Sequence, residues 1–274
     1  MAKKERLDAR LVREGLFPTR EKAQRAILAG MVRVSGQRVT KAGNPTAEDA
    51  PVEVDRPAIE YVSRGALKLE RALSVFGIDP AGRTAMDVGA STGGFTDLLL
   101  QRGATHVYAV DVGYGQLAWK LRQDPRVSVL ERTNVRHLTP EGLGAPEGQE
   151  PELAVIDVSF ISLGKILPAV RGLLKAPGDL VALIKPQFEA GKESVGKGGV
   201  VRDPEVHARV IREVMDAARA EGWEPWGLTY SPIKGPEGNI EFLGYWRREA
   251  APHAVPEAEA VVAEAHRALK AAES

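Results

Sequence analysis

The sequence predicts an α/β protein, with a large domain built on a mainly parallel sheet of seven strands and a small α+β unit before it. From residue 61 onward, apolar runs typical of strands alternate with stretches of helical periodicity, which favours a parallel sheet covered by helices on both faces. Before residue 57 the predicted elements are short and basic residues dominate. At 274 residues, 43% of them hydrophobic, the chain is long enough for both parts.

The small unit is predicted to hold two helices, a hairpin and one further strand. The first helix is indicated by apolar residues at helical spacing and a glycine near its end: Leu7, Leu11, Val12 and Gly15. Thr19 can cap a second helix that has an apolar face and a terminal glycine: Ala23, Ala26, Ile27 and Gly30. Residues 32–39 alternate around Ser35-Gly36, which predicts the hairpin, and 51–55 read as a strand.

The large domain contains seven apolar runs that we predict as strands: 84–91, 106–113, 127–134, 153–160, 180–188, 226–232 and 241–248. Helical stretches between them include 96–103, 115–123 and 206–222. Residues 256–274 are predicted as a C-terminal helix with Val262, Ala265 and Leu269 on one face, which packs or frays.

Composition excludes several classes of function. Cysteine is absent, so disulfides, thiolate zinc sites and a cysteine nucleophile are excluded. The five histidines lack metal-ligand spacing, so we expect no metal. No apolar run approaches the roughly 20 residues of a membrane span, and the N-terminus is charged rather than signal-like. We therefore expect a cytoplasmic protein with no membrane partner.

The basic residues are concentrated at the N-terminus. Residues 1–41 carry eleven Lys/Arg against four Asp/Glu, a charge of +7 in a chain of zero net charge. Such a surplus is either a solvated helical face or a nucleic-acid footprint. The unit resembles the S4 RNA-binding domain in Arg6-Leu7-Asp8, in residues 20–30 and in Val32-Arg33-Val34, with Thr19 where Ser is frequent. The resemblance favours RNA, and the expected contacts are Arg6, Arg10, Arg20, Lys22, Arg25, Arg33, Arg38 and Lys41.

The glycine cluster in "MDVGASTGGF", residues 86–95, predicts a cofactor loop after the first strand of the large domain. Its spacing, Gly89, Gly93 and Gly94, differs from the G-x-G-x-x-G of dinucleotide-binding folds. Asp87 stands before the first glycine, where its carboxylate would repel a pyrophosphate. S-adenosyl-L-methionine is cationic and has no phosphate, so it fits this loop better than a dinucleotide does.

Each part of that cofactor has a candidate partner. Asp87 would line the methionine end, and Gly89 would let the backbone approach the ligand. The chain would then turn into the next helix through Ser91, Gly93, Gly94 and Phe95. Asp111, ending the second strand, would accept the ribose hydroxyls, and Asn134, after the third, would read the adenine edge.

Methyl transfer needs a positioned acceptor and help with its proton. Asp157 ends the fourth strand beside the expected cofactor site, where no Pro-Pro-aromatic motif is found, which argues against a base nitrogen as acceptor. We expect three other ionisable residues at the carboxyl edge of the sheet: Lys185 after the fifth strand, Glu241 at the start of the last strand, and Lys68 in the helix before the sheet. Any one of them alone would be interpreted as a surface charge.

Together, Lys68, Asp157, Lys185 and Glu241 resemble the catalytic tetrad of FtsJ-like ribose 2′-O-methyltransferases. With the S4 unit, the chain to about residue 248 is similar to the TlyA family of rRNA cytidine 2′-O-methyltransferases, which also carry the name haemolysin. The resemblance implies a Rossmann-like S-adenosylmethionine-dependent domain, catalytic roles for the tetrad, and a cofactor region at Asp87, Gly89, Asp111 and Asp157. It also implies ribosomal RNA, or ribosomal subunits, as the partner and cytidine as the acceptor.

Several alternatives stay open at this point. Lys185 is either a general base, which requires a pKa lowered from about 10.4 toward about 7 to 8, or a cation that only orients the hydroxyl. The chain could instead be an RNA-binding ribosome assembly factor with a vestigial cofactor fold. A membrane-lytic role has no spanning or cationic amphipathic segment to support it. The predicted domains are 1–56, a linker at 57–64, 65–248, and a helical tail at 249–274; the target nucleotide and oligomeric state are not predicted.

Overall fold

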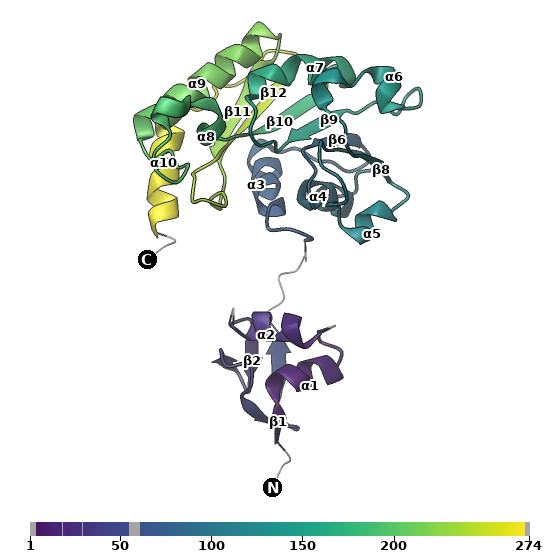
Figure 1. The fold of residues 1–274 in the computed structure, drawn as a ribbon, viewed down its shortest axis with the longest axis vertical. Helices are drawn as coiled ribbons and strands as arrows, with labels where there is room; N and C mark the ends of the chain where they lie inside the picture. The colour runs from purple at the N-terminus through teal and green to yellow at the C-terminus, as the bar shows by residue number, and fades with distance from the viewer. Residues whose placement is uncertain (1–3, 18, 29, 55–60, 272–274) are drawn as a thin grey trace. The chain divides into compact units, whose positions relative to one another are not determined.

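The structure is a computed structural model that describes residues 4–17, 19–28, 30–54 and 61–271 (Figure 1). Its contacts divide the chain into two compact units, residues 1–60 and 61–274. The predicted linker spans both sides of this division, and its residues 57–60 lie outside the described residues.

The small unit has the predicted two helices, hairpin and final strand. Helices α1 (Leu7–Arg13) and α2 (Arg20–Leu28) pack together, and the backbone N–H of Lys22 donates to Thr19 Oγ1 at 3.3 Å, as expected of a capping residue. A three-stranded antiparallel sheet has the order β3 (Gln37–Val39), β2 (Val32–Val34), β5 (Val52–Val54). A second small sheet, in which β1 (Lys4–Arg6) pairs antiparallel with β4 (Pro45–Ala47), was not predicted.

The large unit contains the predicted seven-stranded sheet. Its spatial order is β11-β12-β10-β9-β6-β7-β8. The strands β10, β9, β6, β7 and β8 are parallel, and β12 runs antiparallel to both of its neighbours. Their bounds are β6 Thr84–Val88, β7 His106–Val110, β8 Val127–Leu130, β9 Leu153–Ile156, β10 Asp179–Ile184, β11 Glu224–Tyr230 and β12 Phe242–Arg247.

Helices cover both faces of this sheet. On one face α7 (Leu167–Leu173), α9 (Pro204–Ala220) and α10 (Ala258–Ala271) contribute to a single apolar core, and on the other α3 (Ala66–Phe76) and α4 (Gly94–Gln101) do so. Short helices are α5 (Trp119–Arg122), α6 (Pro140–Leu143), α8 (Pro186–Glu189) and the 3-10 turns Val135–His137, Leu163–Lys165 and Lys192–Ser194. The C-terminal helix packs its expected face, Val262, Ala265 and Leu269, into the core.

The helix predicted over 115–123 is reduced to one turn. Gly115 has a φ of +74°, and Ala118 is extended with a ψ of 138°, so the backbone reaches helical geometry only at Trp119. Residues 111–118 instead form a loop beside the carboxyl end of β7, which leaves space near the glycine cluster.

The register of the sheet brings polar residues from three strands to one edge. Asp157 follows the end of β9, and Lys185 follows the end of β10. Because β12 is antiparallel and pairs Phe242 with Ile184, the residue before it, Glu241, lies at that same edge. The carboxyl edge of the sheet therefore collects side chains that are far apart in the sequence.

Candidate active site

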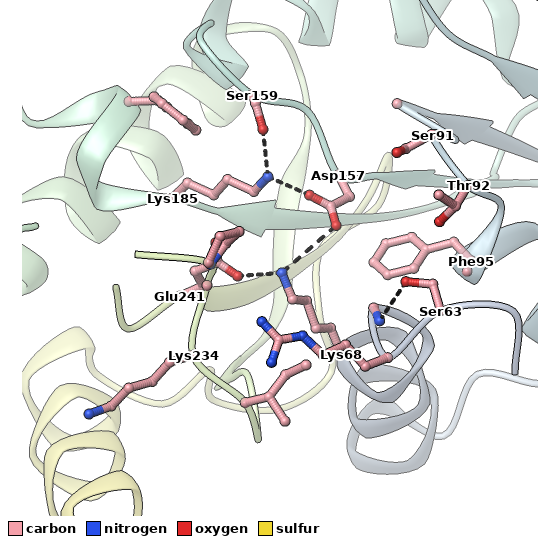
Figure 2. Close-up of a pocket in the computed structure, with 18 of the residues that line it drawn as sticks. Ser63, Lys68, Ser91, Thr92, Phe95, Asp157, Ser159, Lys185, Lys234 and Glu241 are labelled. Carbon is pink, nitrogen blue, oxygen red and sulfur yellow. Dashed lines mark hydrogen bonds and ion pairs between the residues drawn. The ribbon is translucent and has the colours of Figure 1, made fainter. Parts of the chain in front are cut away.

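Four side chains form a continuous chain of alternating charge at the carboxyl edge of the sheet (Figure 2). Lys68 Nζ lies 2.6 Å from Glu241 Oε2 and 3.9 Å from Asp157 Oδ2. Lys185 Nζ lies 2.6 Å from Asp157 Oδ1. The order is therefore Glu241, Lys68, Asp157, Lys185, with each charge next to an opposite one.

This arrangement allows charged groups to exist away from solvent. The exposed fraction is 1% for the Glu241 side chain, 9% for Lys68, 10% for Lys185 and 21% for Asp157. Burying a charge is costly unless it is paired, and the two cations and two anions compensate one another. Asp157 is the most exposed of the four side chains, and Glu241 is the most buried.

The four residues line one cavity of about 440 Å³, within the size range of small-molecule sites. Ser63, Arg64 and Gly65, at the start of α3, and the glycine loop form part of its wall. Of the sequence-predicted residues, those that line it are Lys68, Gly89, Ser91, Gly94, Phe95, Asp157, Lys185 and Glu241.

The glycine loop is shaped by close backbone contacts. Gly89 has a φ of +85°, and a Cβ placed there would lie 2.3 Å from the carbonyl oxygen of Asp157. A Cβ on Gly93, whose φ is +97°, would lie 2.2 Å from Leu121 Cδ1, so Gly93 supports the loop from beneath and does not line the cavity. The position of Gly94 brings the N-terminus of α4 against that of α3, since its Cβ would lie 3.2 Å from Ala66 N.

Asp87 lies beneath the loop and does not line the cavity, where we expected it to reach the methionine end. Its side chain is fully buried, and Oδ2 accepts a hydrogen bond from Thr96 Oγ1 at 2.7 Å. Oδ1 has no hydrogen-bond partner among the described residues. Burial above all, with a contribution from the nearby Asp157 charge, raises the pKa of this carboxyl to about 7. Any influence of Asp87 on a ligand would therefore be electrostatic and not by direct contact.

Asp111 and Asn134 lie apart from the main cavity. Asp111 borders a small adjoining cleft with Ser91, and its two oxygens accept hydrogen bonds from Ser91 N at 2.7 Å and Gly113 N at 2.6 Å. Asn134 Oδ1 accepts from Arg136 N at 3.1 Å, so its side chain caps the following turn. Both side chains are therefore bonded to backbone N–H groups, and Asp111 also borders a cleft.

More than half of the residues that line the cavity were not predicted from the sequence. The missed residues are Ser63, Arg64, Gly65, Ala90, Thr92, Ser159, Phe160, Gln187, Phe188 and the loop Ile233, Lys234, Gly235, Pro236, Glu237. Ser63 could have been suspected because it precedes a helix, and its Oγ accepts from Gly65 N at 3.1 Å. Ser159 and Phe160 immediately follow the predicted Asp157, but in a loop without a motif.

In the small unit the expected RNA-binding side chains fall into three groups. Arg10 is buried and donates to the carbonyls of Ala47 and Ala50, at 2.6 and 2.8 Å, so it holds the fold together and offers no surface contact. Arg33 is half-buried. The exposed members are Arg6, Arg20, Lys22, Arg25, Arg38 and Lys41.

Buried Asp8 organises two of those exposed cations. It accepts hydrogen bonds from Arg6 at 3.0 Å and from Arg20 at 3.1 Å, as well as from Gln24. These bonds, that of Arg6 above all, hold the pKa of the Asp8 carboxyl well below its usual value. The two guanidinium groups are thereby fixed side by side on the surface.

Within the described ranges, no three or more His, Asp or Glu side chains are grouped so that they could hold a metal ion. None of the helices that the structure describes is long and apolar enough to cross a membrane.

Each of the two units matches a known protein family. Residues 61–248 match the family FtsJ-like methyltransferase, and residues 5–45 match the S4 domain. The chain is 54% identical over 274 residues to "Putative rRNA methyltransferase YqxC" of Bacillus subtilis, covering 98% of this chain and 96% of that protein.

Two further relatives extend this agreement. The chain is 49% identical to "16S/23S rRNA (cytidine-2'-O)-methyltransferase TlyA" of Mycobacterium tuberculosis, over 91% of this chain and 92% of that one. A solved structure, "Putative hemolysin from Streptococcus thermophilus", has 44% identity and a TM-score of 0.74, and the match covers 100% of this chain and 99% of that chain.

Proposed function

Because the chain belongs to the FtsJ-like methyltransferase family and carries an S4 domain, we propose that it methylates the 2′-hydroxyl of a ribose in ribosomal RNA, with S-adenosyl-L-methionine as methyl donor. The observation that carries the proposal is the alternating chain Glu241, Lys68, Asp157, Lys185, which ends in a cavity. Cytidine is proposed as the acceptor because the name of the M. tuberculosis relative specifies it.

The residues of the cavity fit the methyl donor. When bound, S-adenosyl-L-methionine supplies a methyl group activated by a sulfonium. Gly89 lines the cavity, and because it has no Cβ the loop packs against the main chain of Asp157 and lies beside the charged chain. The N-termini of α3 and α4 converge near Gly65 and Gly94, and their partial positive charge suits the carboxylate of the methionine moiety. Asp111 would accept from the ribose hydroxyls of the donor.

Lys185 is proposed to act on the acceptor. The acceptor oxygen forms a bond to the methyl carbon as the carbon–sulfur bond breaks, and it loses its proton. Lys185 Nζ would hold this oxygen in line and either receive the proton or orient the oxygen while water receives it. Lys68 and Glu241 act through Asp157 by holding its carboxylate in place, so they are positioning residues in this scheme.

The S4 unit is proposed to dock the RNA through its exposed cations. Arg6 and Arg20, which Asp8 holds, would make the fixed contacts, and Lys22, Arg25, Arg38 and Lys41 the more adaptable ones. Ribosomal RNA as substrate would place the protein in the cytoplasm with the ribosomes.

The decisive experiment is the transfer of labelled methyl from S-adenosyl-L-methionine to purified 30S and 50S subunits, followed by nuclease digestion and mass spectrometry of the nucleosides. The expected product is 2′-O-methylcytidine, absent in Lys185→Ala and retained in Lys175→Ala, which removes an exposed lysine outside the cavity. Tight RNA binding without label would favour an assembly factor instead. Label on a base atom would refute the assignment of the acceptor.

A further inference from the structure

Lys185 Nζ has a second polar contact besides the carboxylate of Asp157. It donates to Ser159 Oγ at 3.1 Å, and Ser159 lines the same cavity (Figure 2). The nitrogen also lies 5.9 Å from the centre of the Phe188 ring, at the outer limit of a cation–π contact. Ser159 and Asp157 therefore approach one nitrogen from the same loop.

The two contacts differ in kind. Asp157 Oδ1 lies 2.6 Å from the nitrogen without hydrogen-bond geometry, so this contact is an ion pair with no fixed direction, whereas Ser159 Oγ accepts a directed hydrogen bond. We propose that Ser159 is a positioning residue for methyl transfer: its hydrogen bond fixes the rotation of the Lys185 amine, so that another position on the nitrogen faces the acceptor hydroxyl. The inference rests on the function proposed above and deepens it.

Asp157 alone would not fix this orientation. An amine held by a single carboxylate can still turn about the axis of that contact, and Asp157 is itself shared with Lys68 at 3.9 Å. The directed hydrogen bond to Ser159 restricts this rotation. It does so in both charge states of the lysine, because each has an N–H to donate. A remaining position on the nitrogen is then an N–H that orients the hydroxyl oxygen or a lone pair that accepts its proton.

The loop that carries Ser159 is braced against the segment that carries Lys185. Phe160 has a φ of +65°, which is costly for a non-glycine residue and is retained only where other contacts fix it. Its ring packs on that of Phe188 with centroids 4.9 Å apart, and Glu189 Oε1 accepts from Leu163 N at 2.8 Å. Residues 159–163 and α8 thus form one cross-linked unit, within which the distance from Ser159 to Lys185 is held.

The test compares four proteins under single-turnover conditions: wild type, Ser159→Ala, Ser159→Thr and Ser162→Ala. Ser162 lies in the same loop, and its hydroxyl is directed to Glu189 and not to Lys185, so it is the matched control. The affinities for S-adenosyl-L-methionine and for RNA are measured separately by calorimetry and by filter binding.

Loss of a hydrogen bond from a charged donor lowers a rate by about 10- to 100-fold when the bond supports the transition state. We therefore expect Ser159→Ala to lower the methyl-transfer rate at saturating substrates by about that factor. Both dissociation constants should stay within about twofold of wild type, because the proposal assigns the Ser159 hydroxyl to Lys185 and to neither ligand. Ser159→Thr, which keeps the hydroxyl, should recover most of the rate, and Ser162→Ala should resemble wild type.

A wild-type rate in Ser159→Ala would overturn the positioning role. So would a loss of affinity or of stability that accounts for the whole defect, or a Ser159→Thr variant as slow as Ser159→Ala. If the wild type itself forms no 2′-O-methyl product, the proposed function fails and this inference fails with it. The two failures are thus distinguished by the wild-type control.

Discussion

Substitution of Gly89 tests whether the glycine loop connects the proposed site of the methyl donor to the charged side chains that include Asp157 and Lys185. The residue has a φ of +85°, and an added Cβ would lie 2.3 Å from the carbonyl oxygen of Asp157, 2.9 Å from its carbonyl carbon and 3.1 Å from Val158 Cγ1. Gly89→Ala therefore imposes two separate penalties, backbone strain and a collision with the main chain of Asp157. The collision cannot be relieved by turning a flexible side chain.

The expected loss of unfolding free energy in Gly89→Ala is the sum of these two penalties. Left-handed geometry costs a non-glycine residue about 1–2 kcal/mol. Forcing a shift in packed main chain costs roughly 1–3 kcal/mol more. The sum, about 2–5 kcal/mol, is less than the whole stability of an ordinary domain, about 5–15 kcal/mol, so the variant should fold.

Gly82→Ala is the matched control. Gly82 has a similar φ of +75°, but no atom lies within 4 Å of its added Cβ, so only the strain applies. The free energy of unfolding in urea should fall by about 1–2 kcal/mol in Gly82→Ala and by more in Gly89→Ala. Calorimetry should show unchanged S-adenosyl-L-methionine affinity for Gly82→Ala and at least a tenfold loss for Gly89→Ala.

Methyl transfer should also decline in Gly89→Ala beyond what saturating donor restores, because the shifted Asp157 carries the carboxylate that holds Lys185. Equal stabilities, donor affinities and rates in the two variants would refute the link between the proposed donor site and the charged side chains. A normal rate at saturating donor would limit the defect to binding.

Three further predictions concern charge. Glu241→Ala should cost about 3–5 kcal/mol of unfolding free energy, because the buried Lys68 ammonium then keeps only its 3.9 Å contact with Asp157. The double variant Lys68→Met with Glu241→Leu should recover most of that free energy in urea denaturation. Because the folded-state pKa of Asp87 is about 7 and its unfolded value 3.8, its stabilising contribution is complete below pH 4 and disappears as pH rises to about 7. The free energy of unfolding, measured for wild type and Asp87→Asn from pH 4 to 7, should show this fall as a decreasing difference between the two proteins. Lys22→Glu should weaken RNA binding and reduce its salt dependence, by about 0.7–0.9 in the log–log slope for each phosphate that is no longer neutralised, in titrations at several salt concentrations.

Each of these has a contrary outcome. A double variant at positions 68 and 241 that is less stable than Glu241→Ala would show that the pair contributes more than mutual neutralisation. A stability difference between wild type and Asp87→Asn that stays constant, or rises, from pH 4 to 7 would contradict the raised pKa. An unchanged salt slope in Lys22→Glu, matching that of Lys175→Glu, would remove Lys22 from the proposed RNA-binding surface.

The sheet edge could be predicted from the sequence because strand ends carry a clear signal. Asp157 and Lys185 each interrupt a buried apolar run, and the carboxyl ends of parallel strands meet at one edge. Glu241 was predicted there as well, although the residue precedes its strand. The antiparallel pairing of β12 with β10 explains why the start of one strand lies beside the end of the other.

The direction of side chains was harder to predict. All five residues of β6 are buried, so no alternation distinguishes its two faces, and Asp87 points beneath the loop. Asn134 follows a strand as a ligand-binding residue would, but an asparagine there can equally bond its own backbone two residues on. Strands β1 and β4 have three residues each, too few to show a period, and they lie too far apart in the sequence to be joined by a turn such as Ser35-Gly36, which links β2 and β3.

The sequence also does not show which of the basic residues lie at the surface. The surplus of basic residues in the first 41 positions is visible in the sequence, but its distribution between fold and surface depends on pairing. Arg10 is bonded to two carbonyls inside the unit, whereas Arg6 and Arg20 are held at the surface by one buried carboxylate. Pairing differs in the same way between the two lysines of the cavity, since Lys68 lies between two carboxylates and Lys185 contacts one carboxylate and one serine hydroxyl. In both units an acidic side chain determines how a neighbouring cation is held, so the proposed RNA-binding surface depends on the acids as well as on the bases.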